Sequence, residues 1–317
     1  MSILCAIPLI SLLFSCTEVS YETIKLRRPT TIDCKGQAYN KGKVTELQIL
    51  ADDVTIKRCK INGSIRTIGL GRNGESKGVK ESSITLGHTA RAQAAAPKNT
   101  VLYKVTITGH GRIPLYLGPG TTRLTIYDST LNGRSDSVAL YLDAESGHNI
   151  IRNNKFNVDG DFTLRQFRVR EVIAVDGSAD NQILSNTINN AKGGGIYLYR
   201  NCGEGGTVRH QAPQNNFIAG NTIDNTGGYG IWLGSRNGGR SYCDNDKGFP
   251  FGSSKNDGDF ANDNIVRGNT GKVRDDGSRN QVSIASILST GTFDEEDLAE
   301  FAETLVAGRL DDIYALD

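Results

Sequence analysis

The chain has 317 residues, of which 37% are hydrophobic and 22% are charged, so it is long enough for one large domain or two ordinary ones and is not a disordered polypeptide. Its formal net charge of +1 excludes a general nucleic-acid-binding protein, which would be plainly basic. The 37 glycines, against only 7 prolines, favour many short strands joined by tight turns.

Residues 1–16 are interpreted as an export signal. Their apolar run, residues 3–14, is too short to span a bilayer but has the length of the hydrophobic region of a signal peptide. The ending LFSC resembles the lipobox of bacterial lipoproteins, although no Lys or Arg precedes the run and Phe14 is bulky for its position. We expect an exported protein in the periplasm, on the outer membrane or outside the cell, with membrane attachment only through a lipid on Cys16. A buried N-terminal strand or helix is the alternative.

Four further cysteines are expected to form disulfides, because an even number in an exported chain favours such bonds. We pair Cys34 with Cys59 and Cys202 with Cys243. None of the four lies in a CxxC pair or close to a His, which argues against a zinc site.

A recurring phrase, Asn-x-Ile-x-x-Asn, indicates a stack of similar units. It occurs at 149–154, 181–186, 216–221 and, with Val in the Ile position, 264–269. Short alternating strands lie between the copies, as in Ile-Tyr-Leu and Ile-Trp-Leu. A unit of strand, turn, strand and turn cannot bury its own apolar face, so neighbours have to stack into a solenoid. The asparagines are interpreted as structural, with stacked amides satisfying turn backbone groups and one another.

Extra length between repeats predicts long loops on one face. Two of the turns that follow the alternating strands need 18 and 31 residues, where the two preceding turns need 7 and 6. Loops are therefore predicted side by side at about 201–215 and 235–263, with a third, at about 157–170, in the other turn. Insertions gathered on one face usually mark the binding face.

The predicted solenoid occupies residues 17–290, and a C-terminal helix occupies 291–317. A capping box at 292–295 opens this helix, and an apolar stripe follows it. Because an open end of the stack exposes unpaired strand edges, we expect the helix to cover the last coil. A partner-binding helix is the alternative.

The stacked Asn-x-Ile-x-x-Asn and Gly-Ile-Tyr-Leu phrases resemble those of right-handed parallel β-helix repeat proteins of the pectate-lyase-like superfamily, over roughly residues 30–290. The resemblance implies an all-β, right-handed parallel β-helix that is carbohydrate-active. That superfamily includes polysaccharide lyases, hydrolases, epimerases and phage tailspikes. Its catalytic motifs are not matched: Asp176 stands where a related strand carries a catalytic Lys, and Gly109-His110-Gly111, read as a turn, lacks the accompanying aspartate pairs.

Stacking the alternating strands in register predicts an aromatic row that faces outward. Exposed rings offer flat surfaces on which sugar rings can lie, so the row is interpreted as substrate-binding. The alternative is that loops cover the rings and that they serve only in packing. The row comprises Tyr116, Tyr141, Ala174, Tyr197 and Trp232.

Beside the aromatic row, Asp143 and Asp176 are predicted on adjacent rungs, with Glu145 next to them as a substrate-binding candidate. Three interpretations stay open. The aspartates could be the acid and nucleophile of a retaining glycosidase, which lie about 5 Å apart. They could hold Ca²⁺. They could also be solvated carboxylates paired with nearby arginines.

Arginine is dense in the predicted loops, and its planar guanidinium suits the carboxylate or sulfate groups of an acidic polysaccharide. Arg200 and Arg236 are catalytic candidates, and Arg240 is a substrate-binding candidate. Tyr199 and His210 are the candidate proton acceptors. A solvated loop His is the alternative for His210.

The leading hypothesis is an exported enzyme that cleaves an acidic, uronate-containing polysaccharide, with β-elimination slightly favoured. An Arg or Ca²⁺ would neutralise the uronate carboxylate, and Tyr199, His210 or an arginine would remove the C5 proton. A glycoside hydrolase that uses Asp143 and Asp176 is the second hypothesis. A non-catalytic glycan-binding or surface-structural β-helix is the alternative from another class.

Overall fold

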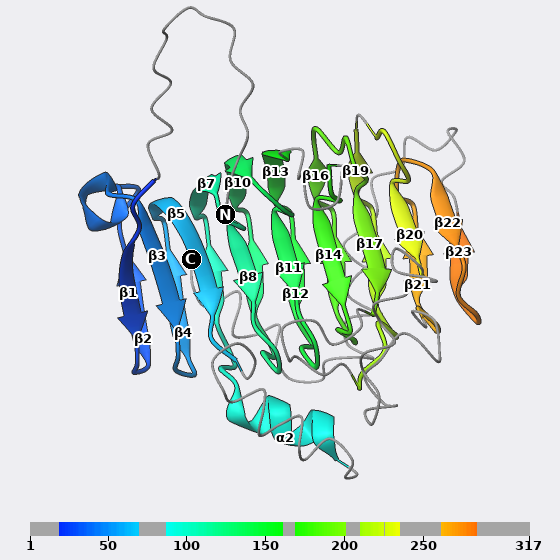
Figure 1. Cartoon of the computed structure of the whole chain (residues 1–317), viewed down its shortest axis with the longest axis horizontal. Helices are drawn as coiled ribbons and strands as arrows, with labels where there is room; N and C mark the ends of the chain where they lie inside the picture. Colours follow the sequence, from blue (N-terminus) through cyan, green and yellow to red (C-terminus); the bar gives the residue numbers. More distant parts are fainter. Residues whose placement is uncertain are drawn as a thin grey trace, which may run out of the picture.

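The structure is a computed structural model that describes residues 19–69, 87–160, 169–200, 210–224, 226–234 and 261–283. Short parallel strands wind into an elongated stack of coils (Figure 1), so the predicted parallel β-helix is confirmed. Each coil contributes one strand to each of two long sheets, and the coils in the middle of the stack add a strand to a third.

Three faces enclose the core. Sheet A comprises β1 (Glu22–Leu26), β3 (Thr45–Ile49), β5 (Lys60–Thr67), β8 (Leu115–Leu117), β11 (Leu140–Leu142), β14 (Ile173–Asp176), β17 (Ile196–Tyr199), β20 (Ile231–Leu233) and β22 (Val273–Asp275). Sheet B comprises β2 (Thr30–Asp33), β4 (Val54–Lys57), β6 (Val101–Tyr103), β9 (Thr125–Tyr127), β12 (Ile150–Arg152), β15 (Gln182–Leu184), β18 (Phe217–Ala219), β21 (Ile265–Arg267) and β23 (Gln281–Ser283).

Sheet C is shorter, and β5 joins it to sheet A because that strand pairs with β7 through its first half and with β8 through its second. Its other strands are β7 (Thr106–Gly111), β10 (Thr130–Ser135), β13 (Lys155–Gly160), β16 (Thr187–Ile188) and β19 (Thr222–Ile223). Gly109-His110-Gly111, which was read as a turn, belongs to β7; that expectation is wrong.

Aligned aliphatic residues fill the interior. In sheet B, register pairing runs from Ile126 through Ile151 and Ile183 to Ile218, and all four are fully buried. Alternation along each strand sends these side chains inward and their neighbours outward. Burial of β-branched residues rung upon rung supplies the apolar contact that no single coil could make alone.

The asparagines form two continuous ladders, as predicted. Asn181 donates from its side-chain amide to Asn216 Oδ1 over 2.8 Å, and its own Oδ1 accepts from the Asn149 backbone and amide. Asn186 repeats this arrangement with Asn154 and Asn221 at the next corner. All of these side chains are buried, so each amide supplies the hydrogen bonds that the neighbouring turn would otherwise lack.

Two further elements and a disulfide lie in the N-terminal half. A 3₁₀ helix, η1 (Tyr39–Gly42), lies between β2 and β3, and α2 (His88–Ala95) lies beside the corner that follows sheet A (Figure 1). The predicted Cys34–Cys59 disulfide is present, with the two Cα atoms 4.8 Å apart. Helix α2 was not expected from the sequence.

Several predictions fall outside the described residues. These are the export signal at 1–16, the C-terminal helix at 291–317, the Cys202–Cys243 pair, Arg236 and Arg240. No helix in the described part of the chain is long and apolar enough to cross a membrane.

Candidate functional site

The candidate site lies on the outward face of sheet A, where the predicted aromatic row has the expected register. Tyr116 pairs with Tyr141, Tyr141 with Ala174, and Tyr197 with Trp232 on successive strands. The Tyr116 and Tyr141 ring centroids lie 5.7 Å apart, and those of Tyr197 and Trp232 lie 5.3 Å apart. The periodicity of the short strands therefore located the row correctly.

The expected exposure of this row is wrong for its three tyrosines. Tyr116, Tyr141 and Tyr197 are only 5%, 8% and 5% exposed, whereas Trp232 is half-buried. Together with Ala174 and Tyr199, the tyrosines form a second apolar cluster outside the main core. A polysaccharide that approaches the middle of sheet A thus does not meet open tyrosine rings.

The row instead supplies hydrogen-bond donors to the predicted carboxylates. Tyr116 donates its hydroxyl to Asp143 Oδ2 on the next strand, and Tyr141 does the same to Asp176 Oδ2. The Ala144 backbone also donates to Asp143 Oδ1 over 2.8 Å. Both aspartates are buried, so the interpretation as solvated carboxylates is wrong.

A second polar cluster joins Arg170, Glu171 and Tyr199 on neighbouring coils. The Tyr199 hydroxyl donates to Glu171 Oε1 over 2.7 Å and accepts from Arg170 Nη2 over 2.6 Å. Arg170 also donates to Glu171 Oε1 over 2.8 Å and to the Ser137 hydroxyl over 3.0 Å. Burial is the largest single effect and by itself would lower the pKa of Arg170. The charge of Glu171, the neighbouring Tyr199 and Tyr141, and the hydrogen bond to Glu171 together outweigh it and raise that pKa well above its ordinary value.

Glu171 was not a predicted site residue, although it accepts a hydrogen bond from the hydroxyl of Tyr199, which was. It is 2% exposed and lies two residues before the buried strand β14. A charged residue next to a fully buried strand is a signal that the sequence does contain. Such residues are rarely buried without a partner.

Glu145 and His210 meet at the corner beyond sheet A, away from the aromatic row. Glu145 is 1% exposed; its Oε1 accepts from the backbone amides of His210 and Gln211, and its Oε2 accepts from Thr89 of α2. Burial raises the pKa of this carboxyl above its ordinary value, against the opposing effects of these hydrogen bonds and of the Arg200 charge. Glu145 therefore ties α2 and the 210–211 segment to the coil, and the substrate-binding role proposed for it has no geometric support.

No group of three or more His, Cys, Asp and Glu side chains that could hold a metal ion occurs among the residues that the structure describes. Asp143 and Asp176 each accept a tyrosine hydroxyl instead. Ca²⁺ requires six to eight oxygen ligands, so the two carboxylates alone do not make a calcium site. Arg200, the predicted catalytic cation, is 4% exposed at the end of β17.

The face opens at its C-terminal end. Trp232 lies there with Tyr229, their ring centroids 5.6 Å apart, and the Arg274 guanidinium lies 4.6 Å from the Trp232 ring. Asp276 accepts from Trp232 Nε1 and from Arg274 Nε, each over 2.8 Å. Lys272 adds a second cation 5.1 Å from the Tyr229 ring. Among the described residues of the face, this group combines accessible rings with accessible cations.

The stacked parallel strands define the class of protein. The family model described as "Right handed beta helix region" matches residues 51–245, so the chain belongs to the right-handed β-helix family. Among solved structures, the chain is similar to ORF18 of Geobacillus virus E2, with 10% sequence identity and a TM-score of 0.38. The similarity covers 84% of this chain and 50% of that one, so the chain spans about half its length. The search of curated proteins found no match.

Proposed function

We propose that the chain is a carbohydrate-active enzyme that binds an acidic, uronate-containing polysaccharide along sheet A and cleaves it by β-elimination. The observation that carries the proposal is the contact of the Tyr199 hydroxyl with Glu171 and Arg170, one rung from Asp176. We further propose that the protein acts outside the cytoplasm, which the Cys34–Cys59 disulfide supports.

The proposed step uses Tyr199 as the base. Its hydroxyl proton passes to Glu171, and Arg170 stabilises the phenolate that results. The phenolate takes the C5 proton of the uronate while Arg200 neutralises the sugar carboxylate, and the C4–O bond breaks to leave a C4–C5 double bond. The proton held by Glu171 then goes to the departing O4, so that every proton and electron pair is accounted for.

Access to this cluster starts at the open end of the face. Tyr199 and Asp176 are fully buried, so a polymer reaches them only when the groups in front of them move. Trp232, Tyr229 and Arg274 are the side chains that it meets first. Aromatic rings and cations together suit a sugar chain that carries carboxylates.

Two other functions each have one observation in their favour. Asp143 and Asp176 lie two residues beyond Tyr141 and Ala174, which pair in register on adjacent strands. Neighbouring strands are about 4.8 Å apart, which suits the two carboxylates of a retaining hydrolase. The burial of both aspartates favours instead a non-catalytic glycan-binding or surface-structural protein. A β-helix needs no active site to serve as a rigid support.

The test is a panel of acidic polysaccharides incubated with the protein, with and without Ca²⁺, in which unsaturated uronate and reducing ends are measured together. A lyase raises both signals, and a hydrolase raises reducing ends alone. Tyr199→Phe is expected to abolish the unsaturated product, whereas Tyr39→Phe, in η1, is expected to keep full activity. Full activity in Tyr199→Phe would overturn the proposed base. Binding without either product across the panel would favour the non-catalytic function.

A further inference from the structure

A second face of the molecule carries cations around an open hollow. The hollow has a volume of about 580 Å³ and is lined by Lys35, Gly36, Arg58 and Lys104. The three cations follow β2, β4 and β6, which are hydrogen-bonded neighbours in sheet B. Lys35, Arg58 and Lys104 have φ angles of 50°, 53° and 49°, so a left-handed backbone conformation recurs at each corner. The solenoid thus repeats a positive charge from coil to coil.

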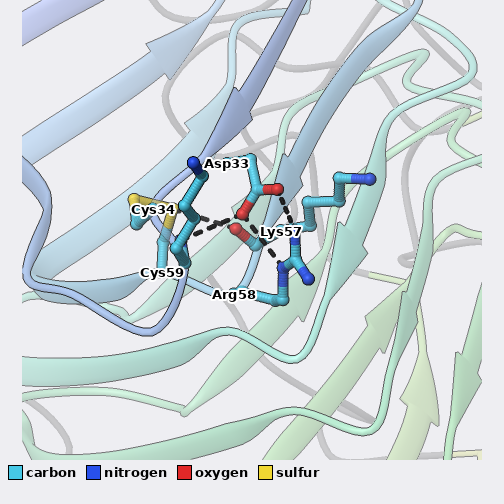
Figure 2. The surroundings of a disulfide bond; sticks show 6 residues. Asp33, Cys34, Lys57, Arg58 and Cys59 are labelled. Atoms are coloured by element: carbon cyan, nitrogen blue, oxygen red, sulfur yellow. Dashed lines mark hydrogen bonds and ion pairs between the residues drawn. A yellow bond between two sulfur atoms is a disulfide. The ribbon is translucent and has the colours of Figure 1, made fainter. Parts of the chain in front are cut away.

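The disulfide and one ion pair hold this corner in place. Cys34 precedes Lys35 and Cys59 follows Arg58, so the Cys34–Cys59 bond joins the two coils at the hollow (Figure 2). Arg58 donates from Nε to Asp33 Oδ1 over 3.0 Å and from Nη2 to Asp33 Oδ2. The hydrogen bond from Arg58 lowers the pKa of Asp33 to about 2, so the pair stays charged. A fixed guanidinium loses less conformational entropy when it binds an anion.

Stacked aromatic rings adjoin the cations. The Tyr103 and Tyr127 rings lie 4.4 Å apart with an interplanar angle of 21°, and Lys104 Nζ lies 4.5 Å from the Tyr103 centroid. Of the two stacked rings, Tyr103 is buried and Tyr127 is half-buried. Arg152 pairs in register with Tyr127 on the next coil. Two stacked rings from successive coils therefore lie beside a cation, Lys104.

We propose that this corner of sheet B binds an anionic saccharide. Lys35, Arg58 and Lys104 hold its carboxylate or sulfate groups, and Tyr127 contacts a sugar ring. Single-stranded nucleic acid also uses rings and cations. Asp33 and Asp128 at the same corner, and a net charge of only +1, oppose a continuous phosphate backbone. The site lies on a different sheet from the Tyr199 cluster and does not depend on cleavage there.

Calorimetric titration of the full chain with short oligogalacturonates and with sulfated oligosaccharides tests the proposal and separates the two anion types. The double variant Lys35→Gln/Lys104→Gln is expected to bind the preferred oligosaccharide about tenfold more weakly. Lys98→Gln is the matched control, because Lys98 precedes β6, at the opposite end of that strand from Lys104, and pairs with Asp52. Tyr127→Leu is expected to weaken oligosaccharide binding without changing competition by inorganic sulfate.

Four results would overturn the proposal. Two concern affinity: no binding of either oligosaccharide, or equal affinity of the double variant and the wild type. The other two concern the ligand: inorganic sulfate that competes as strongly as an oligosaccharide, or a single-stranded DNA oligomer that binds more tightly than the oligosaccharides. The outcome is separable from the proposed cleavage. Loss of binding in Trp232→Ala but not in the double variant would reject the sheet B site and keep the proposed site on sheet A. Weakened binding in the double variant together with no product in the cleavage panel would support the sheet B site and argue against the proposed cleavage.

Discussion

At the scale of single residues, the buried carboxyl of Glu145 makes the stability of the fold depend on pH. Glu145 is enclosed by Thr89 and by the backbone amides of His210 and Gln211, and burial raises the pKa of its carboxyl. Because the native state then holds this proton more tightly than the unfolded chain does, Glu145 stabilises the fold fully below its unfolded pKa. That contribution is lost as pH rises through the folded pKa.

Glu145→Gln should therefore gain stability relative to wild type as pH rises above about 4.5, the usual pKa of a glutamate. The amide oxygen can still accept from His210 and Gln211. Chemical unfolding at several pH values measures the difference. Glu46→Gln is the control of opposite sign: burial raises the pKa of Glu46, but hydrogen bonds from Gln48 and Arg112 and the charge of Arg66 lower it overall. It should lose stability above that pH, and parallel pH profiles for the two variants would contradict this account.

The ladder asparagines make a second prediction at the same scale. Asn186 donates to Asn221 Oδ1 over 2.9 Å and to the Ile151 carbonyl over 2.8 Å, and accepts from Asn154. Asn186→Ala leaves these buried groups without partners and should lower the free energy of unfolding by about 3 kcal/mol. Asn189→Ala, which removes a partly exposed amide on sheet C, should cost about 1 kcal/mol or less. Equal losses in the two variants would argue against the ladder as a stabilising element.

At the scale of elements, α2 depends on one glycine. Gly120 has a φ of 79°, and a Cβ there would lie 2.4 Å from the Ala92 carbonyl oxygen of α2. Gly120→Ala should therefore displace the helix and lower the free energy of unfolding by about 3 kcal/mol. Gly42 has the same φ, but its Cβ would meet nothing closer than 4.0 Å, so Gly42→Ala should show only the backbone strain, about 1 kcal/mol. Faster hydrogen exchange in α2 for Gly120→Ala alone is the expected readout.

The elements also show what the sequence could and could not predict. The register of Tyr116, Tyr141, Tyr197 and Trp232 followed from alternation, because a period of two fixes which side chains share a face. Helix α2 was missed because no copy of the asparagine phrase brackets the stretch between β5 and β6. The burial of the tyrosines was also missed, because side-chain exposure depends on what packs over a strand and not on its own periodicity.

The residues of the candidate site were likewise only partly predictable from the sequence. Tyr199 was chosen because alternation places it outward, two residues beyond the aromatic row, and its neighbour Asp176 follows from the strand pairing. Glu171 was missed because it lies outside the strands and its contact with Tyr199 joins residues 28 positions apart. Strand pairing fixes backbone neighbours, but the direction of a long side chain depends on the local packing around it.

At the scale of the whole molecule, the first coil should be less stable than the coils in the middle of the stack. In a solenoid, stability comes largely from contacts between neighbouring coils, and a terminal coil has only one neighbour. Here β1 pairs only with β3, and β2 pairs only with β4, among the described strands. The Cys34–Cys59 bond joins this first coil to the second, with Cys59 in the core. It closes a loop of 25 residues and should contribute about 3 kcal/mol by restricting the unfolded chain.

The double variant Cys34→Ser/Cys59→Ser should therefore fray the N-terminal end before the rest of the molecule. Hydrogen exchange is expected to speed up in β1 and β2 and to stay unchanged in β12 and β15, which have neighbours on both sides. The hollow lined by Lys35 and Arg58 should lose its fixed geometry at the same time, so anionic saccharides should bind more weakly even though no cation has been removed. Uniform acceleration along the whole stack would instead mean that the coils unfold as one cooperative unit and that the disulfide acts on all of them.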